Sequence, residues 1–411
     1  MRREDRADPA SKTIVIVKTS QRENESEFTE RKKRQMESPL AEADQLLRKV
    51  PLIDGHNDLA WAVRKDGHLG VADLDRLQPS LQTDLVRLQS GRVGGQFWSV
   101  YVPCRFKGSD AVAATIEQIE FVHRMIEHYP NNLALATSAK QVEDAFATGR
   151  VASLLGAEGG HCIGESLGIL RAFYRLGVRY LTLTHNENTS WAEAATDVSI
   201  GGLRPFGYEV ISEMNLLGML VDLAHTSRST ALASIQASRA PVVMTHSSCR
   251  ELVDHPRNVD DETMRALADA GGVMMLTFVP SFISAECAEW DAALRRKAVS
   301  QGMDPRDLDV LRELEKEQEL PRPKATLSHV IEHLEYAREI VGVESIGLGG
   351  DYDGMSEVPV GLEDVSCYPA LFAALLERGW SVTDCTKLAG QNILRVLHEA
   401  EGVAKSLSRY Q

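Results

Sequence analysis

The 411-residue sequence has no long hydrophobic run. No apolar stretch approaches the roughly 20 residues that a membrane-spanning helix needs. The apolar segment at residues 13–17 is too short for the core of a signal peptide, and the C-terminal segment 406–411 lacks the hydrophobic tail of a lipid-anchor signal. We therefore expect a cytoplasmic location, with no transmembrane segment and no lipid anchor.

Paired cysteines and an excess of basic residues are also missing. The 6 cysteines are scattered without a CxxC pair, so they form neither a thiolate zinc motif nor a dense disulfide framework. The formal net charge of −14 argues against nucleic acid as a partner, because nucleic acid selects for a basic surface. The same charge is compatible with attracting a divalent cation.

The chain divides into an extension and one folded domain. Residues 1–39 are rich in Arg, Glu, Lys and Ser and have little to bury, so we expect a disordered N-terminal extension. A single domain is expected over residues 40–405. Within it, the connection between residues 279 and 345 is unusually long and contains a charged, helix-prone segment. We predict a helical insertion at about residues 280–325 that serves as a lid, a wall of the pocket or an oligomer contact.

Eight short apolar runs are expected to form strands. They lie at residues 51–58, 95–102, 151–158, 178–184, 218–225, 241–246, 272–279 and 345–351. Continuous apolar runs are typical of buried parallel strands, and segments with helical periodicity lie between them. Eight strand–helix units predict a closed (β/α)8 barrel of the TIM type. A doubly wound open sheet is the alternative, but it gives no reason for polar residues after most strands.

Residue types that bind metals follow five of these runs, at the strand ends where α/β barrels build their active sites. They are His56 and Asp58, Glu158, His225, His246 and Asp351. Strand parity places His56 and Asp58 on one side, where they can hold one ion. His225 and His246 end adjacent strands and can hold a second ion. Glu158 is expected to bridge the two, because a buried carboxylate is costly unless it is paired with positive charge.

This set of imidazoles and carboxylates suits Zn²⁺ better than Mg²⁺ or Ca²⁺. The sequence therefore predicts two Zn²⁺ bridged by Glu158 and a water or hydroxide, which would attack a carbonyl polarised by the ions. We assign Asp351 as the general base that passes the water's proton to a leaving amine, and Asp353 to a turn. His185, after the fourth run, is expected to donate to the developing oxyanion rather than to bind metal.

Arg257 lies past His246 and has two possible roles. Its guanidinium could bind a substrate carboxylate, or it could form an ordinary surface ion pair. Four other histidines, His161, His255, His329 and His333, are expected to have no part in the site. We place the last two on a solvated helix face because of their spacing with acidic residues.

Seven sequence strings together resemble the membrane (renal) dipeptidase family of zinc metallopeptidases. They are DGHNDLAW, GGQFWSVYVPC, GAEGGH, RYLTLTHNENTSWAE, GMLVDLAHTS, HSSCRELVDHPRN and GLGGDYDG, and the resemblance covers about residues 45 to 400. It implies an amidohydrolase-like barrel that hydrolyses L-Xaa-L-Xaa and L-Xaa-D-Xaa dipeptides, and a homodimer. It also implies the ligands given above, substrate contacts from His185 and Arg257, and proton transfer by Asp351.

The chain departs from the mammalian members, which are secreted, disulfide-bonded and lipid-anchored. It lacks their signal, their anchor tail and a cysteine shortly after His185, and so resembles a bacterial-type soluble member. Two alternatives are a binuclear amidohydrolase acting on a non-peptide amide or lactone, and a catalytically silent binding homologue. The first is disfavoured because such enzymes often use H-x-H and a carboxylated lysine. The second would predict a missing ligand, yet every position is filled.

Overall fold

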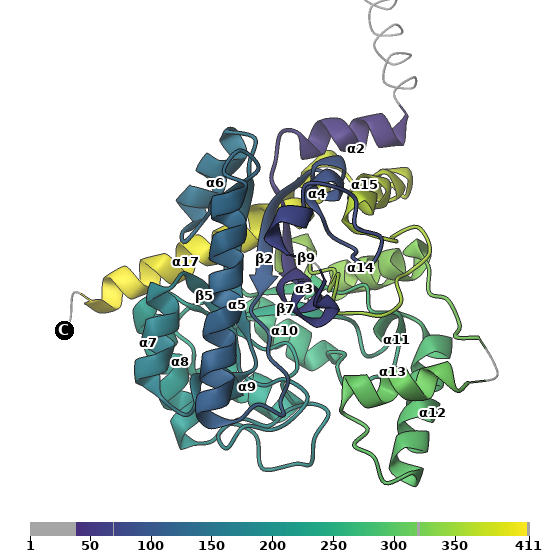
Figure 1. Ribbon diagram of the computed structural model, residues 1–411. Helices are drawn as coiled ribbons and strands as arrows, with labels where there is room; N and C mark the ends of the chain where they lie inside the picture. The colour runs from purple at the N-terminus through teal and green to yellow at the C-terminus, as the bar shows by residue number, and fades with distance from the viewer. Residues whose placement is uncertain (1–37, 69, 319–320, 409–411) are drawn as a thin grey trace, which may run out of the picture.

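The computed structural model describes residues 38–68, 70–318 and 321–408 (Figure 1). The predicted extension lies outside the described residues except for its last two. Ser38 caps helix α2 (Pro39–Leu47) by accepting from the backbone N–H of Ala41, and Pro39 begins that helix. The first helix of the described residues therefore begins at the point where the composition becomes amphipathic.

Eight parallel strands among the described residues close a barrel. They are β1 (Leu52–Asn57), β2 (Val93–Ser99), β4 (Val151–Glu158), β5 (Val178–Thr182), β6 (Leu220–Asp222), β7 (Val243–Ser247), β8 (Val273–Leu276) and β9 (Ile346–Leu348). Each strand pairs with the next in this order, and β9 pairs with β1. This confirms the predicted (β/α)8 barrel and excludes the open sheet.

A ninth strand, β3 (Leu133–Leu135), pairs only with the first residues of β4. Every residue of the eight barrel strands is buried, whereas β3 is buried only at Leu133. Burial on both faces explains the continuous apolar runs, since a strand with a solvent face would alternate. The strand β3 is only three residues long, and its apolar segment is too short to be distinguished as a strand from the sequence, so it was not predicted.

Helices surround the barrel (Figure 1). The main ones after α2 are α3 (Leu59–Asp66), α4 (Leu85–Ser90), α5 (Gly108–His128), α6 (Ala139–Ala147), α7 (Leu167–Arg175), α8 (Pro205–Leu217), α9 (Arg228–Ala237), α10 (Asp261–Asp269), α14 (Leu327–Val341), α15 (Tyr368–Glu377), α16 (Val382–Thr386) and α17 (Asn392–Leu407). Their ends follow from the sequence. Ser138, Ser166, Ser227 and Asp260 cap α6, α7, α9 and α10 by accepting backbone N–H groups. Pro205 begins α8, and Gly218 ends it at a φ of 78°.

Two apolar layers hold the barrel together. Side chains inside the barrel, including Ile53, Phe97, Tyr180 and Met275, form one cluster with residues of α6 and α17. A larger cluster fills the space between the strands and the surrounding helices. The interior is therefore a packed core, and the open space lies at the carboxyl ends of the strands.

The predicted insertion contains three helices among the described residues: α11 (Pro280–Ile283), α12 (Ala285–Ser300) and α13 (Leu308–Lys316). Helices α12 and α13 stand apart from α5, α6 and α7 in Figure 1. They share a small apolar cluster of their own, formed by Leu294, Ala298, Leu311 and Leu314. Ion pairs tie the segment to helix α3, from Asp309 to Lys65 at 2.6 Å, and to the loop between β5 and α8, from Arg306 to Asp197 at 2.7 Å.

Candidate metal centre

The sequence-predicted site residues all lie at the carboxyl end of the barrel. His56 and His246 are near the ends of β1 and β7, and Glu158 is the last residue of β4. Asp58 directly follows β1, and His225 and Asp351 each lie three residues beyond β6 and β9. The five expected metal ligands are at most 7% exposed, so their polar atoms are withdrawn from water. Burial without a partner would be costly for each of them.

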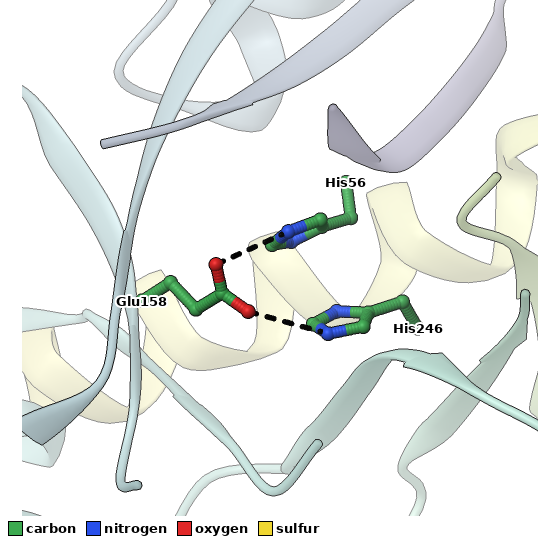
Figure 2. A group of neighbouring side chains, drawn as sticks. All are labelled: His56, Glu158 and His246. Atoms are coloured by element: carbon green, nitrogen blue, oxygen red, sulfur yellow. Dashed lines mark ion pairs between the residues drawn. The ribbon is translucent and has the colours of Figure 1, made fainter. Parts of the chain in front are cut away.

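Glu158 lies at the centre of the group. Its Oε2 is 3.5 Å from Nε2 of His56. Its Oε1 is 2.9 Å from Nε2 of His225 and 3.4 Å from Nε2 of His246. Figure 2 shows the carboxylate facing the neighbouring rings of His56 and His246, whose centroids are 3.8 Å apart, with one oxygen directed to each ring. The two oxygens of one side chain thus serve two groups of imidazoles.

Three overlapping sets of ligand atoms are close enough to hold a cation, each within 4.8 Å. They are His56, Glu158 and His246; Glu158, His185 and His225; and His56, Asp58 and Asp351. Nε2 of His56 is also 3.4 Å from Oδ2 of Asp58, which brings the predicted H-x-D pair together. Asp351 and His185 therefore lie closer to the ligand atoms than the sequence alone indicated.

Several atoms at this site lack any hydrogen-bond partner in the described part of the chain. They are Nε2 of His56, Oδ1 of Asp58 and Nδ1 of His225, all buried. Buried polar atoms are normally satisfied, and an unpaired one costs about 1–3 kcal/mol. A nitrogen and oxygen donor set with open positions suits a borderline-soft divalent cation. The residues present therefore fit a zinc site.

The electrostatics of the group agree with metal binding. Burial lowers the pKa values of His225 and His246 well below their ordinary range, with further lowering from Arg257 and His185 at His225 and from His56 and Arg257 at His246. Burial acts in the same direction on His56, but Tyr180 and Glu158 outweigh it and raise the pKa of His56 well above its usual value. Neutral imidazole is the form that binds a metal, and a cation bound at His56 would displace its proton.

Arg257 is buried beside this group and forms no ion pair with a carboxylate among the described residues. One of its amino groups donates to the carbonyl oxygen of His246 at 3.2 Å, and its Nε has no partner. The guanidinium lies over the ring of Phe282 at 5.3 Å. Burial lowers the pKa of Arg257 to about 10, which leaves it charged at neutral pH. The expected alternative of an exposed surface ion pair is therefore wrong.

His185 lies against the same carboxylate. Its Nε2 is 3.8 Å from Oε1 of Glu158, and its Nδ1 is 3.6 Å from the thiol of Cys104. Its ring packs on that of Tyr101 at 4.8 Å. Sequence reasoning did not single out Cys104 or Tyr101, although both belong to the GGQFWSVYVPC string and follow β2.

The backbone around Asp351 is strained. His225, Asp351 and Asp353 have φ values of 70°, 62° and 65°, in the left-handed region that non-glycine residues rarely adopt. Such conformations cost about 1–3 kcal/mol each and gather at functional sites. Only glycine fits at position 354 of this turn, because a Cβ there would lie 2.3 Å from Oδ1 of Asp351 and 2.3 Å from Oδ2 of Asp58.

A cavity of about 320 Å³ opens onto these residues. Its inner wall includes Asp58, Glu158, His185, His225, Arg257 and Asp351, and its outer wall includes Trp290, Leu294, Arg306 and Leu311 from the insertion. Of the three roles expected for the insertion, the structure therefore shows that it forms a wall of the pocket.

Two of the histidines set aside in the sequence analysis are placed differently. His255 lines the cavity, packs on Phe282 at 4.5 Å and accepts the backbone N–H of Arg257. His333 is 2% exposed, so its assignment to a solvated face is wrong. Its Nδ1 accepts the backbone N–H of Cys249, a contact between distant segments that helical spacing cannot indicate.

Comparisons with known proteins agree with this geometry. Residues 40–411 match the family model described as membrane dipeptidase (peptidase family M19). Similar solved structures include the probable dipeptidase PvdM from Pseudomonas aeruginosa (23% identity, TM-score 0.78, covering 89% of this chain and 99% of that chain). Another is an amidohydrolase from Pseudomonas aeruginosa (22% identity, TM-score 0.69, covering 88% of this chain and 99% of that chain). A third is a metallo peptidase from Rhodobacter sphaeroides liganded with a phosphinate mimic of the dipeptide L-Ala-D-Ala (22% identity, TM-score 0.71, covering 85% of this chain and 99% of that chain).

At these identities the solved structures establish the barrel fold, while the family model covers nearly the whole chain. In the described part of the chain, no helix is long and apolar enough to cross a membrane. The chain belongs to the membrane dipeptidase family, peptidase family M19, and is a hydrolytic metallopeptidase.

Proposed function

We propose that this chain is a zinc-dependent dipeptidase that holds two Zn²⁺ and hydrolyses L-Xaa-L-Xaa and L-Xaa-D-Xaa dipeptides. The observation that carries this proposal is the position of Glu158. Its Oε2 faces His56, and its Oε1 faces His225 and His246. A single carboxylate directed at two sets of buried imidazoles is the arrangement that a bridging ligand requires.

In this proposal, His56 and Asp58 hold one ion, and His225 and His246 hold the other. When bound, two such ions supply Lewis-acid chemistry, since they lower the pKa of water and polarise the carbonyl under attack. The unpaired Nε2 of His56 and Oδ1 of Asp58 are the atoms left free for this task. Side chains of the protein carry out the proton transfer and bind the substrate.

Asp351 is proposed to move the proton. Burial raises the pKa of Asp351 well above its usual value, with help from the nearby carboxylates of Asp58 and Glu158 and against the opposing effect of His56. A carboxyl group with a raised pKa can accept a proton at one oxygen and release it again. Asp351 would take this proton from the attacking water and deliver it to the nitrogen of the leaving amine.

Arg257 and His185 are proposed to bind the substrate. The buried guanidinium of Arg257 forms no ion pair with an acidic side chain of the described residues, and its planar donors suit the terminal carboxylate of a dipeptide. The Nε2–H of His185, directed toward Glu158, would donate to the oxygen that becomes negative in the transition state. The cavity of about 320 Å³ is at the small end of ligand pockets, which agrees with a substrate of two residues.

The alternative of a carboxylated-lysine amidohydrolase has less support. Among the described residues that line the cavity, none is a lysine, and it is Glu158 whose carboxylate faces His56, His225 and His246. No observation favours a non-peptide amide or lactone over a dipeptide.

A dipeptide library tests the proposal directly. The zinc-loaded chain is expected to hydrolyse L-Xaa-L-Xaa and L-Xaa-D-Xaa members, to lose this activity on chelation, and to regain it when Zn²⁺ is restored. Blocked dipeptides without a free carboxylate serve as the matched control. Undiminished hydrolysis by the chelated chain would contradict the proposal.

A further inference from the structure

Asp222 is a buried carboxylate behind the metal centre. It is the last residue of β6 and is 0% exposed. Its Oδ1 accepts the backbone N–H groups of Ala224 at 3.1 Å and Thr245 at 2.9 Å. Its Oδ2 accepts the hydroxyls of Thr182 at 2.6 Å and Thr245 at 2.8 Å. Four donors therefore occupy the two oxygens, and Asp222 acts only as an acceptor.

This arrangement determines what Thr245 can offer to His246. The hydroxyl of Thr245 has one hydrogen, which it donates to Asp222. Its oxygen is also 3.0 Å from Nδ1 of His246, and there it can only accept. Nδ1 of His246 must therefore carry the ring proton, and Nε2 keeps its lone pair. Nε2 is the atom that faces Oε1 of Glu158 at 3.4 Å.

We propose that Asp222 and Thr245 are positioning residues that fix His246 in the Nδ1–H tautomer, so that its Nε2 lone pair is set in advance to bind the metal. The proposal rests on the proposed function, in that Nε2 of His246 is taken as a zinc ligand. Partners behind a metal-binding histidine fix its tautomer and ring orientation, and their loss typically lowers metal affinity about 10–100-fold.

We call the hydrogen-bond chain from Asp222 through the hydroxyl of Thr245 to Nδ1 of His246 the relay. Among the described residues, His56 and His225 lack such a relay. Nδ1 of His56 contacts the hydroxyl of Tyr180 at 2.9 Å, with no carboxylate behind it, and Nδ1 of His225 has no partner in the described chain. Burial raises the pKa of Asp222, and its donors oppose that rise. A carboxylate inside the apolar run 218–225 is thus costly to the fold. Its contact with Thr245 gives a functional reason for keeping it there.

The variant Asp222→Asn reverses the relay with little change in shape. The two backbone N–H groups cannot turn away, so the amide oxygen must face them and the amide NH₂ must face the hydroxyls. The hydroxyl of Thr245 then accepts from Asn and donates its hydrogen to Nδ1 of His246, which moves the ring proton to Nε2. We expect the affinity for Zn²⁺ to fall about 10–100-fold.

Two threonine variants provide matched controls. Thr182→Val removes a hydroxyl donor from the same oxygen of Asp222 but contacts no imidazole, so its affinity for Zn²⁺ should stay near the wild-type value. Thr245→Val removes the relay and should weaken binding as Asp222→Asn does, whereas Thr245→Ser keeps the hydroxyl and should restore it. Equal losses in the Thr182 and Thr245 valine variants would indicate a purely structural role and overturn the proposal.

Zn²⁺ affinity of the full chain can be measured by competition with a chromophoric chelator. The tautomer itself can be read from the ¹⁵N spectrum of the chelator-treated, histidine-labelled chain, with His246 assigned by its loss in His246→Gln. We expect Nδ1 of His246 to be protonated in the wild type and Nε2 in Asp222→Asn. A wild-type spectrum with Nε2 of His246 protonated overturns the proposal, whatever the behaviour of Asp222→Asn. A wild-type chain that binds no Zn²⁺ contradicts the proposed function alone, and the spectrum still decides the relay.

Discussion

Oε1 of Glu158 lies 2.9 Å from Nε2 of His225. Glu158 is the last residue of β4 and His225 follows β6, and strand β5 lies between these two strands. Such a contact is possible because side chains at the carboxyl ends of barrel strands converge on the barrel axis. It places a carboxylate from β4 among imidazoles from the carboxyl ends of β1, β6 and β7. The predictions below follow from this convergence.

Glu158→Gln should reduce the zinc content from two ions per chain to at most one. The amide keeps the shape but offers only one acceptor oxygen, so it cannot serve both groups of imidazoles. Elemental analysis of the purified chain measures the effect. Glu209→Gln, at an exposed position of α8, is the control and should keep both ions. Two ions bound in Glu158→Gln would show that Glu158 does not bridge.

Asp351→Asn should lower kcat about 10²–10⁴-fold while leaving the zinc content unchanged, because it removes a proton carrier. Asparagine tolerates the left-handed backbone at this position. Asp353→Asn is the matched control. Asp353 has nearly the same φ, and its Oδ1 accepts the backbone N–H of Gln82. If Asp353→Asn were as slow as Asp351→Asn, the proton-transfer assignment would be wrong.

Arg257→Lys should lower kcat/KM for free dipeptides about 10–100-fold, because it keeps the charge but loses hydrogen bonds of roughly 1.5–3 kcal/mol each to a carboxylate. The same dipeptides with an amidated C-terminus provide the control. Wild type and variant should hydrolyse these amides equally slowly. An unequal loss on the amides would place the role of Arg257 elsewhere than at the carboxylate.

Gly354→Ala should impair zinc binding, because the new methyl group would lie 2.3 Å from carboxylate oxygens of both Asp58 and Asp351. Gly402→Ala, in α17, meets nothing within 4 Å and should stabilise the helix by about 0.5–1 kcal/mol. Zinc titration and thermal unfolding separate the two effects. Normal zinc binding by Gly354→Ala would mean that these carboxylates need not approach each other.

The hydrogen bonds of Glu193 should make the folding stability of the chain depend on pH. Its Oε2 accepts the hydroxyl of Ser199 and the backbone N–H groups of residues 200–202, within the loop that follows His185. Burial alone would raise the pKa of Glu193, but these donors lower it to about 2. Because the folded-state pKa lies below the unfolded one, the stabilisation is present above about pH 4.5 and is lost as the pH falls toward 2.

Glu193→Gln should therefore unfold more easily than wild type at pH 7, by about 1–3 kcal/mol, and the difference should shrink between pH 4.5 and 2. Urea unfolding at several pH values measures it, with the exposed Glu377→Gln as control. A difference that does not change with pH would show that the charge of Glu193 contributes nothing.

Much of the site could be predicted because its residues end apolar runs. His56, Glu158 and His246 each close a buried strand, and strand ends meet in a parallel barrel. The relay behind His246 was missed, although Asp222 inside an apolar run is a detectable signal. The buried position of His333 and the burial of Arg257 depend on contacts between distant segments, which periodicity does not report.

Anomalous diffraction at the zinc edge, from crystals of the full chain grown with Zn²⁺, tests the proposed bridging by Glu158 most directly. We predict two peaks, one beside each oxygen of Glu158, with His56 and Asp58 at the first and His225 and His246 at the second. A map in which Glu158 contacts no ion would contradict the account.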